Sequence, residues 1–155
     1  MPASVILNAG NEEYAIPISF ITSIEKMEIQ KETSHLGSAM RGMADYRGGK
    51  IPVLDLEAIL FGRKTADDAN SKAAVIQTGR LVFALLAKEA KDVVDIPEEA
   101  MKPLGLAATQ KTKYMSAIAS LGDRMITVLN PEYLLDVLDE ADEIVAFAES
   151  ERQNA

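Results

Sequence analysis

The sequence predicts a mainly β protein, built as a sandwich or as small barrels, with one helix at its C-terminal end. Short extended segments recur along the 155 residues, and turn residues separate them. Three pairs of these segments meet at short glycine-containing turns, as antiparallel hairpins do. Only the segment after Asn130 has apolar residues at a sustained helical spacing. Many short strands with regular turn signals are typical of all-β folds of this kind.

The N-terminal part of the chain predicts three strands. Residues 4–7 and 13–18 have the extended pattern of two strands joined by a turn. Isoleucines at every third position then predict a short helical turn before the third strand, and these are Ile18, Ile21 and Ile24.

The most informative segment is the hairpin DYRGGKIPVLDL, from Asp45 to Leu56. Gly48 and Gly49 tolerate the positive φ angles that a tight turn needs, so we expect them at its centre, with Arg47 beside it. Pro52 has no N–H to donate to a ladder, which predicts that its strand lies at a sheet edge or passes a bulge.

Between this hairpin and residue 129 the sequence predicts one short helix and five more strands. The helix ends at Gly62, a residue type that favours helix C-termini. The helix is expected at residues 56–61, and the strands at residues 74–77, 81–87, 92–96, 115–121 and 124–129.

The C-terminal segment predicts an amphipathic helix over about residues 131–149. Asn130 is a good N-cap, and Pro131 suits the first helical position. We expect the apolar face of this helix to pack against the strands. That face consists of Leu134, Val137, Leu138, Ala141, Ile144, Val145 and Ala148.

Composition and charge exclude several classes of function. The formal net charge of −8 argues against binding to nucleic acid and against docking on an anionic membrane surface. The chain contains no cysteine, so it has neither disulfides nor thiolate metal sites. It shows no secretory signal and no apolar run long enough to cross a membrane, so we expect a soluble cytoplasmic protein.

The sequence offers little for catalysis. His35 is the only histidine and lies in a polar segment, so we expect neither a metal nor a cofactor site. No glycine-rich phosphate loop or nucleophile elbow occurs. Three carboxylates next to turns or strand ends leave one chemical alternative open, a small β-barrel enzyme or ligand-binding protein. They are Asp45, Asp55 and Asp123.

Four segments together resemble the CheW-type coupling proteins of bacterial chemotaxis. DYRGGKIPVLDL resembles that family's NLRGxxIPVxDL hairpin, and SLGDRMITVLNPEYLL, residues 120–135, resembles its G-x-x-x-x-LLNxxxLL ending. Residues 12–28 are similar to its opening strand, short turn and strand, and residues 96–103 to the run before its last hairpin. The resemblance covers nearly the whole chain, in the right order and spacing.

The resemblance implies a fold and a function. Residues 1–155 would form a single domain of two intertwined, five-stranded SH3-like barrels with the C-terminal helix. The protein would be a non-catalytic adaptor without a cofactor. Its partners would be the regulatory domain of the histidine kinase CheA and the cytoplasmic tip of methyl-accepting chemoreceptors. It would lie in the cytoplasm, recruited to membrane-associated receptor arrays without inserting into the membrane.

The resemblance also implies partner-contact residues. Kinase contact in the family comes from a barrel's strand surface, and receptor contact from the groove between the barrels. Arg47 and Gly48 fall on the arginine and glycine of the family's hairpin. The residues expected at receptor or kinase contacts are Ile18, Ile21, Ser23, Glu25, Arg47, Gly48, Ala87, Lys88 and Ala90.

Three positions depart from the family pattern. Ser23 stands where many relatives have a glutamate that can pair with the hairpin arginine, although Glu25 would share its face of the strand. Residues 87–90 replace the frequent V-D-x-V, and Asp45-Tyr46 replaces Asn-Leu. Two alternatives therefore stay open beside the coupling protein. One is a divergent paralogue serving another receptor or kinase pathway, and the other is a lattice component that contacts kinase domains without receptors.

Overall fold

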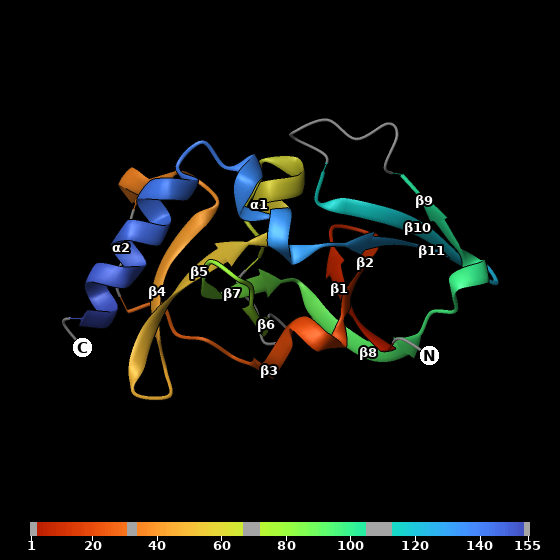
Figure 1. Cartoon of the computed structure of the whole chain (residues 1–155), viewed down its shortest axis with the longest axis horizontal. Helices are drawn as coiled ribbons and strands as arrows, with labels where there is room; N and C mark the ends of the chain where they lie inside the picture. Colours follow the sequence, from red (N-terminus) through yellow and green to blue (C-terminus); the bar gives the residue numbers. More distant parts are fainter. Residues whose placement is uncertain (1–2, 31–33, 67–71, 105–112, 154–155) are drawn as a thin grey trace.

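The computed structural model describes residues 3–30, 34–66, 72–104 and 113–153 and confirms a mainly β fold with a C-terminal helix (Figure 1). Two sheets lie along the long axis of the molecule. Sheet A has six strands in the order β8-β1-β2-β11-β10-β9, and sheet B has five in the order β3-β6-β7-β5-β4. Sheet A exceeds the expected five strands by β9, which is too short to give a pattern in the sequence.

Sheet A combines the two ends of the chain. Its strands pair antiparallel, except that β2 and β11 run parallel. Its strands are β1 (Ala3–Ala9), β2 (Glu12–Pro17), β8 (Glu89–Asp95), β9 (Met101–Pro103), β10 (Met115–Leu121) and β11 (Arg124–Leu129).

Sheet B is formed by the middle of the chain. Its strands also pair antiparallel, except that β5 and β7 run parallel. The chain thus builds part of sheet A, then sheet B, then the rest of sheet A. The strands of sheet B are β3 (Ile21–Glu25), β4 (Met40–Tyr46), β5 (Gly49–Asp55), β6 (Lys72–Gln77) and β7 (Val82–Ala87).

Neither sheet closes into the expected barrel within the described residues, because its two edge strands do not pair with each other. In sheet B, single contacts bridge the edges instead. The backbone N–H of Gln30, beyond the end of β3, donates to the carbonyl of Met43 on β4 at 2.8 Å. The hydroxyls of Ser23 on β3 and Tyr46 on β4 lie 3.3 Å apart.

The two sheets share their largest core. On β1, Val5 and Leu7 point into this core between the sheets, whereas Ile6 points the other way into a smaller core inside sheet A. This division follows from the alternation of side chains along a strand. A third cluster, rich in alanine, lies inside the curve of sheet B around Ile51 and Val53.

The β4–β5 hairpin turns one residue earlier than expected. Tyr46 pairs with Gly49, so the two central residues are Arg47 and Gly48, with φ of 49° and 82°. Pro52 lies in an inner strand, so the edge prediction is wrong. The alternative, a bulge, is present in the β4–β5 pairing, between Met40 and Gly42.

The short helix α1 (Leu56–Phe61) follows β5 and confirms the expected bounds. Asp55 is its N-cap and accepts a hydrogen bond from the backbone N–H of Ala58 at 3.2 Å. Gly62 ends the helix with a φ of 74°, a conformation that favours glycine.

The C-terminal segment differs from the single helix expected over residues 131–149. It forms two 3-10 turns, η5 (Pro131–Tyr133) and η6 (Leu135–Val137), and then the helix α2 (Ala141–Gln153). Leu138 is extended and interrupts the helix. In an unbroken helix, buried Leu135 would share its face with Asp139 and Asp142, so the break keeps these carboxylates in solvent.

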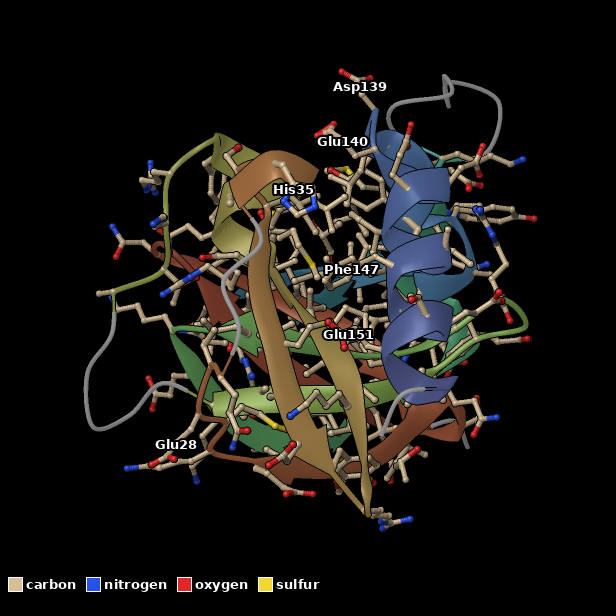
Figure 2. The ribbon with its side chains drawn as sticks, turned by 90° about the vertical axis from the view of Figure 1, so that its left-hand side faces the viewer. Glu28, His35, Asp139, Glu140, Phe147 and Glu151 are labelled. Carbon is tan, nitrogen blue, oxygen red and sulfur yellow. The ribbon has the colours of Figure 1, made fainter. Side chains whose placement is uncertain are left out.

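Helix α2 packs against sheet B near β5, as Figure 1 shows. Ala141, Ile144 and Ala148 are buried there. The turn η2 (Ser34–Leu36) contacts α2 as well, because the His35 ring meets the Phe147 ring edge-on with centroids 5.9 Å apart (Figure 2). Two further turns, η1 (Ile18–Phe20) and η3 (Glu98–Ala100), precede β3 and β9.

Candidate functional site

Arg47 at the tip of the β4–β5 hairpin is in an unfavourable conformation for its residue type. Its φ of 49° is the only positive value of a non-glycine residue in the part of the chain that the structure describes. The left-handed region costs about 1–2 kcal/mol for a residue with a Cβ. Strain of this kind often marks functional positions.

The side chain of Arg47 is exposed. It lies over the ring of Tyr46, 4.9 Å from the ring centroid. No ion pair to Arg47 occurs among residues 3–30, 34–66, 72–104 and 113–153. A neighbouring ring orients such a cation without neutralising its charge.

Tyr46 connects Arg47 to the edge strand β3. The hydroxyl of Ser23 donates to the carboxylate of Glu25 at 2.6 Å and lies 3.3 Å from the Tyr46 hydroxyl. We call Ser23, Glu25, Tyr46 and Arg47 the hairpin cluster. The cluster contains an acidic and a basic side chain that do not pair with each other. Glu25 thus brings a carboxylate next to Ser23.

An ion pair between Lys50 and Asp45 lies next to the hairpin cluster. Lys50 donates to the carboxylate of Asp45 at 2.9 Å and reaches Gln30 at 3.4 Å. The hydrogen bond from Lys50 holds the pKa of Asp45 below its usual value. Asp45 therefore stays ionised and paired with Lys50. Arg47 is then the charge at the hairpin tip that has no ion-pair partner among the described residues.

Two more expected contact residues are Ile18, just before β3, and Ile21, its first residue. Ile18 in η1 is 47% exposed, and Ile24 further along β3 is 38% exposed. Ile21 between them is half-buried against the core between the sheets. These isoleucines form an apolar border at the edge of sheet B.

The remaining expected residues lie at the crossover from β7 to β8. Lys88 is exposed, and its backbone N–H donates to the carbonyl of Asn8 at 3.1 Å. Ala90 is half-buried against the core between the sheets. Ala87 is fully buried in that core, and its place at a partner contact stays a prediction.

A comparison with known protein families decides the identity of the fold. The CheW-like domain family matches residues 4–139, which is most of the chain. The chain belongs to the CheW family. Members of this family are non-catalytic scaffolds of chemotaxis signalling, and this chain is such a scaffold.

Curated relatives and a solved structure agree with the family. The chain is 26% identical over 132 residues to the chemotaxis protein CheW of Klebsiella aerogenes, covering 84% of this chain and 80% of the relative. It is also 26% identical over 132 residues to a probable chemotaxis protein CheW of Rhizobium etli, covering 84% of this chain and 84% of the relative. The crystal structure of the scaffolding protein TtCheW from Thermoanaerobacter tengcongensis is similar with a TM-score of 0.76 and 25% identity, covering 87% of this chain and 93% of that one.

Two of the three carboxylates of the enzyme alternative, Asp45 and Asp55, are held by separate partners in this CheW-family chain. Asp55 is fully buried and accepts hydrogen bonds from the backbone N–H and hydroxyl of Thr65, at 2.9 and 2.6 Å, and from Arg41 at 2.9 Å. Asp45 is paired with Lys50, and Asp123 is exposed in the β10–β11 turn. Figure 1 places the hairpins that hold Asp45 and Asp123 at opposite ends of the molecule.

Sequence reasoning missed two polar residues that position the sheets. Glu57 of α1 accepts a hydrogen bond from the backbone N–H of Gly10 in the β1–β2 turn at 3.0 Å and another from Arg63 at 2.7 Å. The bond from Gly10 ties the β1–β2 turn of sheet A to the helix that lies between β5 and β6 of sheet B. A glutamate in a short helix gives no sequence signal for a partner 47 positions away.

No group of acidic, histidine or cysteine residues in the described ranges could hold a metal ion. A search of the same residues for an apolar helix long enough to span a membrane also found none.

Proposed function

We propose that this chain couples methyl-accepting chemoreceptors to the histidine kinase CheA. It binds the cytoplasmic tip of the receptor with one surface and the regulatory domain of the kinase with another. Its place of action is the cytoplasmic side of membrane-associated receptor arrays. Family membership supports the signalling role, and the hairpin cluster supports the location of one contact.

The observation that carries the receptor contact is the state of Arg47. Its charge is unpaired within the described residues, its backbone is strained, and Tyr46 orients its side chain. Of these features, the strained backbone opposes folding. They agree with a charge that is kept available for a carboxylate of the receptor. Gly48 completes the turn, while Ser23, Glu25, Ile18 and Ile21 lie along the neighbouring edge strand.

We propose that the kinase contact lies on the exposed strand surface at the β7–β8 crossover, outside the hairpin cluster. Lys88 and Ala90 at the β7–β8 crossover belong to the proposed interface. Separate surfaces allow both partners to bind at once, which a coupling protein requires. A lattice component without receptor binding would instead retain kinase and fail to retain receptor tips in separate pull-down experiments.

An Arg47→Glu variant tests the role of the hairpin. We expect it to remain folded and to bind the kinase, but to lose receptor-dependent control of kinase activity. Lys102→Glu is the matched control, because Lys102 is an exposed cation on β9 of the other sheet. Equal receptor control in the wild type and in Arg47→Glu would remove the hairpin from the proposed function.

A divergent paralogue is distinguished by its partners. If the departures at Ser23 and residues 87–90 redirect the chain to another pathway, its affinity for the chemoreceptor tip will be no higher than for unrelated coiled-coil fragments. We expect instead that receptor tips bind, because the Glu25 carboxylate lies beside Ser23. A binding measurement with both kinds of fragment decides between these outcomes.

A further inference from the structure

Sheet B contains a gap where β5 and β7 separate. Their parallel ladder includes only Val53–Asp55 and Ala84–Leu86. Residues 49–52 before it pair with β4 alone, and residues 82–83 pair with β6 alone. A groove of about 410 Å³ opens between these two unpaired strand edges, and helix α2 borders it with Ala148 and Glu149.

Local chemistry explains why the gap stays open. Pro52 has no N–H to donate toward β7, so the ladder cannot extend through it. The turn before β7 is bound to the C-terminal segment of the chain. Arg80 donates to Asp136 and to Asp142, each at 2.9 Å, and the N–H of Gly79 donates to Glu132 at 3.0 Å.

The groove has apolar walls and a charged mouth. Ile51, Pro52, Leu81, Val82 and Ala148 supply apolar surface, and Arg47 lies at the hairpin end. The other two cations of the lining already have partners, since Lys50 pairs with Asp45 and Arg80 pairs with two aspartates. Arg47 is therefore the cation of this groove that remains for a ligand within the described residues.

We propose that this groove binds an extended segment of a partner protein that carries an apolar side chain next to a carboxylate. The apolar side chain enters between β5 and β7, and the carboxylate pairs with Arg47. The backbone of the segment pairs with the unpaired edge of a flanking strand, as in other cases of strand addition. The proposal goes beyond receptor–kinase coupling, because it depends on neither the receptor nor the kinase.

The test uses short capped peptides and the amide NMR spectrum of the whole chain. The probe peptide has a β-forming sequence with leucine followed by glutamate at its centre, and two versions carry glutamine or lysine in place of the glutamate. We expect saturable shifts of the amides of Gly48, Gly49 and Val82 in the millimolar range. The glutamate peptide should bind at least about tenfold more tightly than the lysine peptide, equivalent to about 1.4 kcal/mol.

Variants make the test specific to the groove. Arg47→Glu should reverse the order, so that the lysine peptide binds best. Gly49→Ile should abolish binding of all three peptides by filling the groove. It is compatible with the fold, because a Cβ at residue 49 would have its nearest contact at 3.9 Å. Glu143→Lys is the control, since Glu143 is exposed on α2 and lies outside the groove lining.

Three results would overturn the proposal. They are the absence of saturable shifts at the groove, equal affinity for the three peptides, and unchanged binding to Gly49→Ile. Concentration-dependent shifts of the same amides without peptide would assign the groove to a second copy of the chain and also overturn it. The samples contain neither receptor nor kinase, so failure here would leave the coupling function intact.

Discussion

Arg47 shows a conflict between stability and function at a single residue. A tight hairpin turn with positive φ at both central residues favours asparagine followed by glycine. The chain has arginine followed by glycine, so we expect Arg47→Asn to raise the free energy of unfolding by about 0.5–1 kcal/mol. Urea denaturation measures this change.

The same Arg47→Asn variant should lose receptor control of the kinase. It removes the charge and keeps the turn, so stability and coupling should change in opposite directions. A variant that is less stable than the wild type would show that the arginine itself supports the fold.

Asp55 is a structural residue at the same scale. Its buried carboxylate caps α1 and fixes Thr65, and Arg41 balances its charge. Removing one partner of a buried ion pair costs about 3–5 kcal/mol, so Asp55→Ala should lower the free energy of unfolding by this amount. Asp123→Ala, at an exposed turn, should change it by less than about 0.5 kcal/mol. Similar losses in the two variants would contradict the assignment.

Tyr14 makes stability depend on pH in the alkaline range. Burial, together with the nearby charge of Glu12, raises the pKa of its phenol from 10.0 to about 12. Below the unfolded pKa both states are protonated and the stabilisation is complete. Above it the unfolded chain loses its proton first, so stability falls as the pH rises from about 10 to about 12.

Urea unfolding at several alkaline pH values should therefore show a falling midpoint, and Tyr14→Phe should reduce the fall. Burial raises the pKa of Tyr114 as well, so part of the fall should remain. An identical fall in Tyr14→Phe would show that Tyr14 is not the source.

Residue types alone identified the hairpin arginine but not its conformation. Two consecutive glycines made Gly48-Gly49 the natural centre of the turn, whereas the pairing of Tyr46 with Gly49 moved it one residue back. The role of Asp55 as a cap was predictable from its position before a helix. Its bonds to Arg41 and Thr65 were not, because they depend on packing between segments that are distant in sequence.

At the scale of the element, helix α2 is attached to the rest of the fold mainly by apolar contacts. Ile144 is fully buried in the core between the sheets. An Ile144→Ala change should lower the free energy of unfolding by about 2–5 kcal/mol, whereas exposed Glu143→Ala should change it by less than about 0.5 kcal/mol. Thermal or urea unfolding of both variants tests this. Equal effects would mean that α2 is only loosely attached.

Elements defined by local signals were predictable, and those defined by long-range pairing were not. The hairpins and α1 follow from turn residues and caps that lie within a few positions. The parallel β2–β11 and β5–β7 pairs join strands far apart in the sequence, so no local pattern reveals them. The helical spacing after Asn130 fitted 3-10 turns as well as a helix, which hid the break at Leu138.

At the scale of the whole molecule, the two sheets act as a common support for exposed surfaces. Their shared core and the bond between Gly10 and Glu57 fix the sheets against each other. The buried carboxylate of Asp55 caps α1 and pairs with Arg41. The charge of Arg47, which has no ion-pair partner among the described residues, is at the surface. This distribution fits a scaffold, whose function is to hold other macromolecules in position.

The most direct test of this account is kinase autophosphorylation in a reconstitution of receptor fragments, CheA and this chain. We expect the kinase to come under receptor control only when the wild-type chain is present, and this control to be lost with Arg47→Glu but retained with Lys102→Glu. Receptor control that is the same with and without the chain would contradict the account.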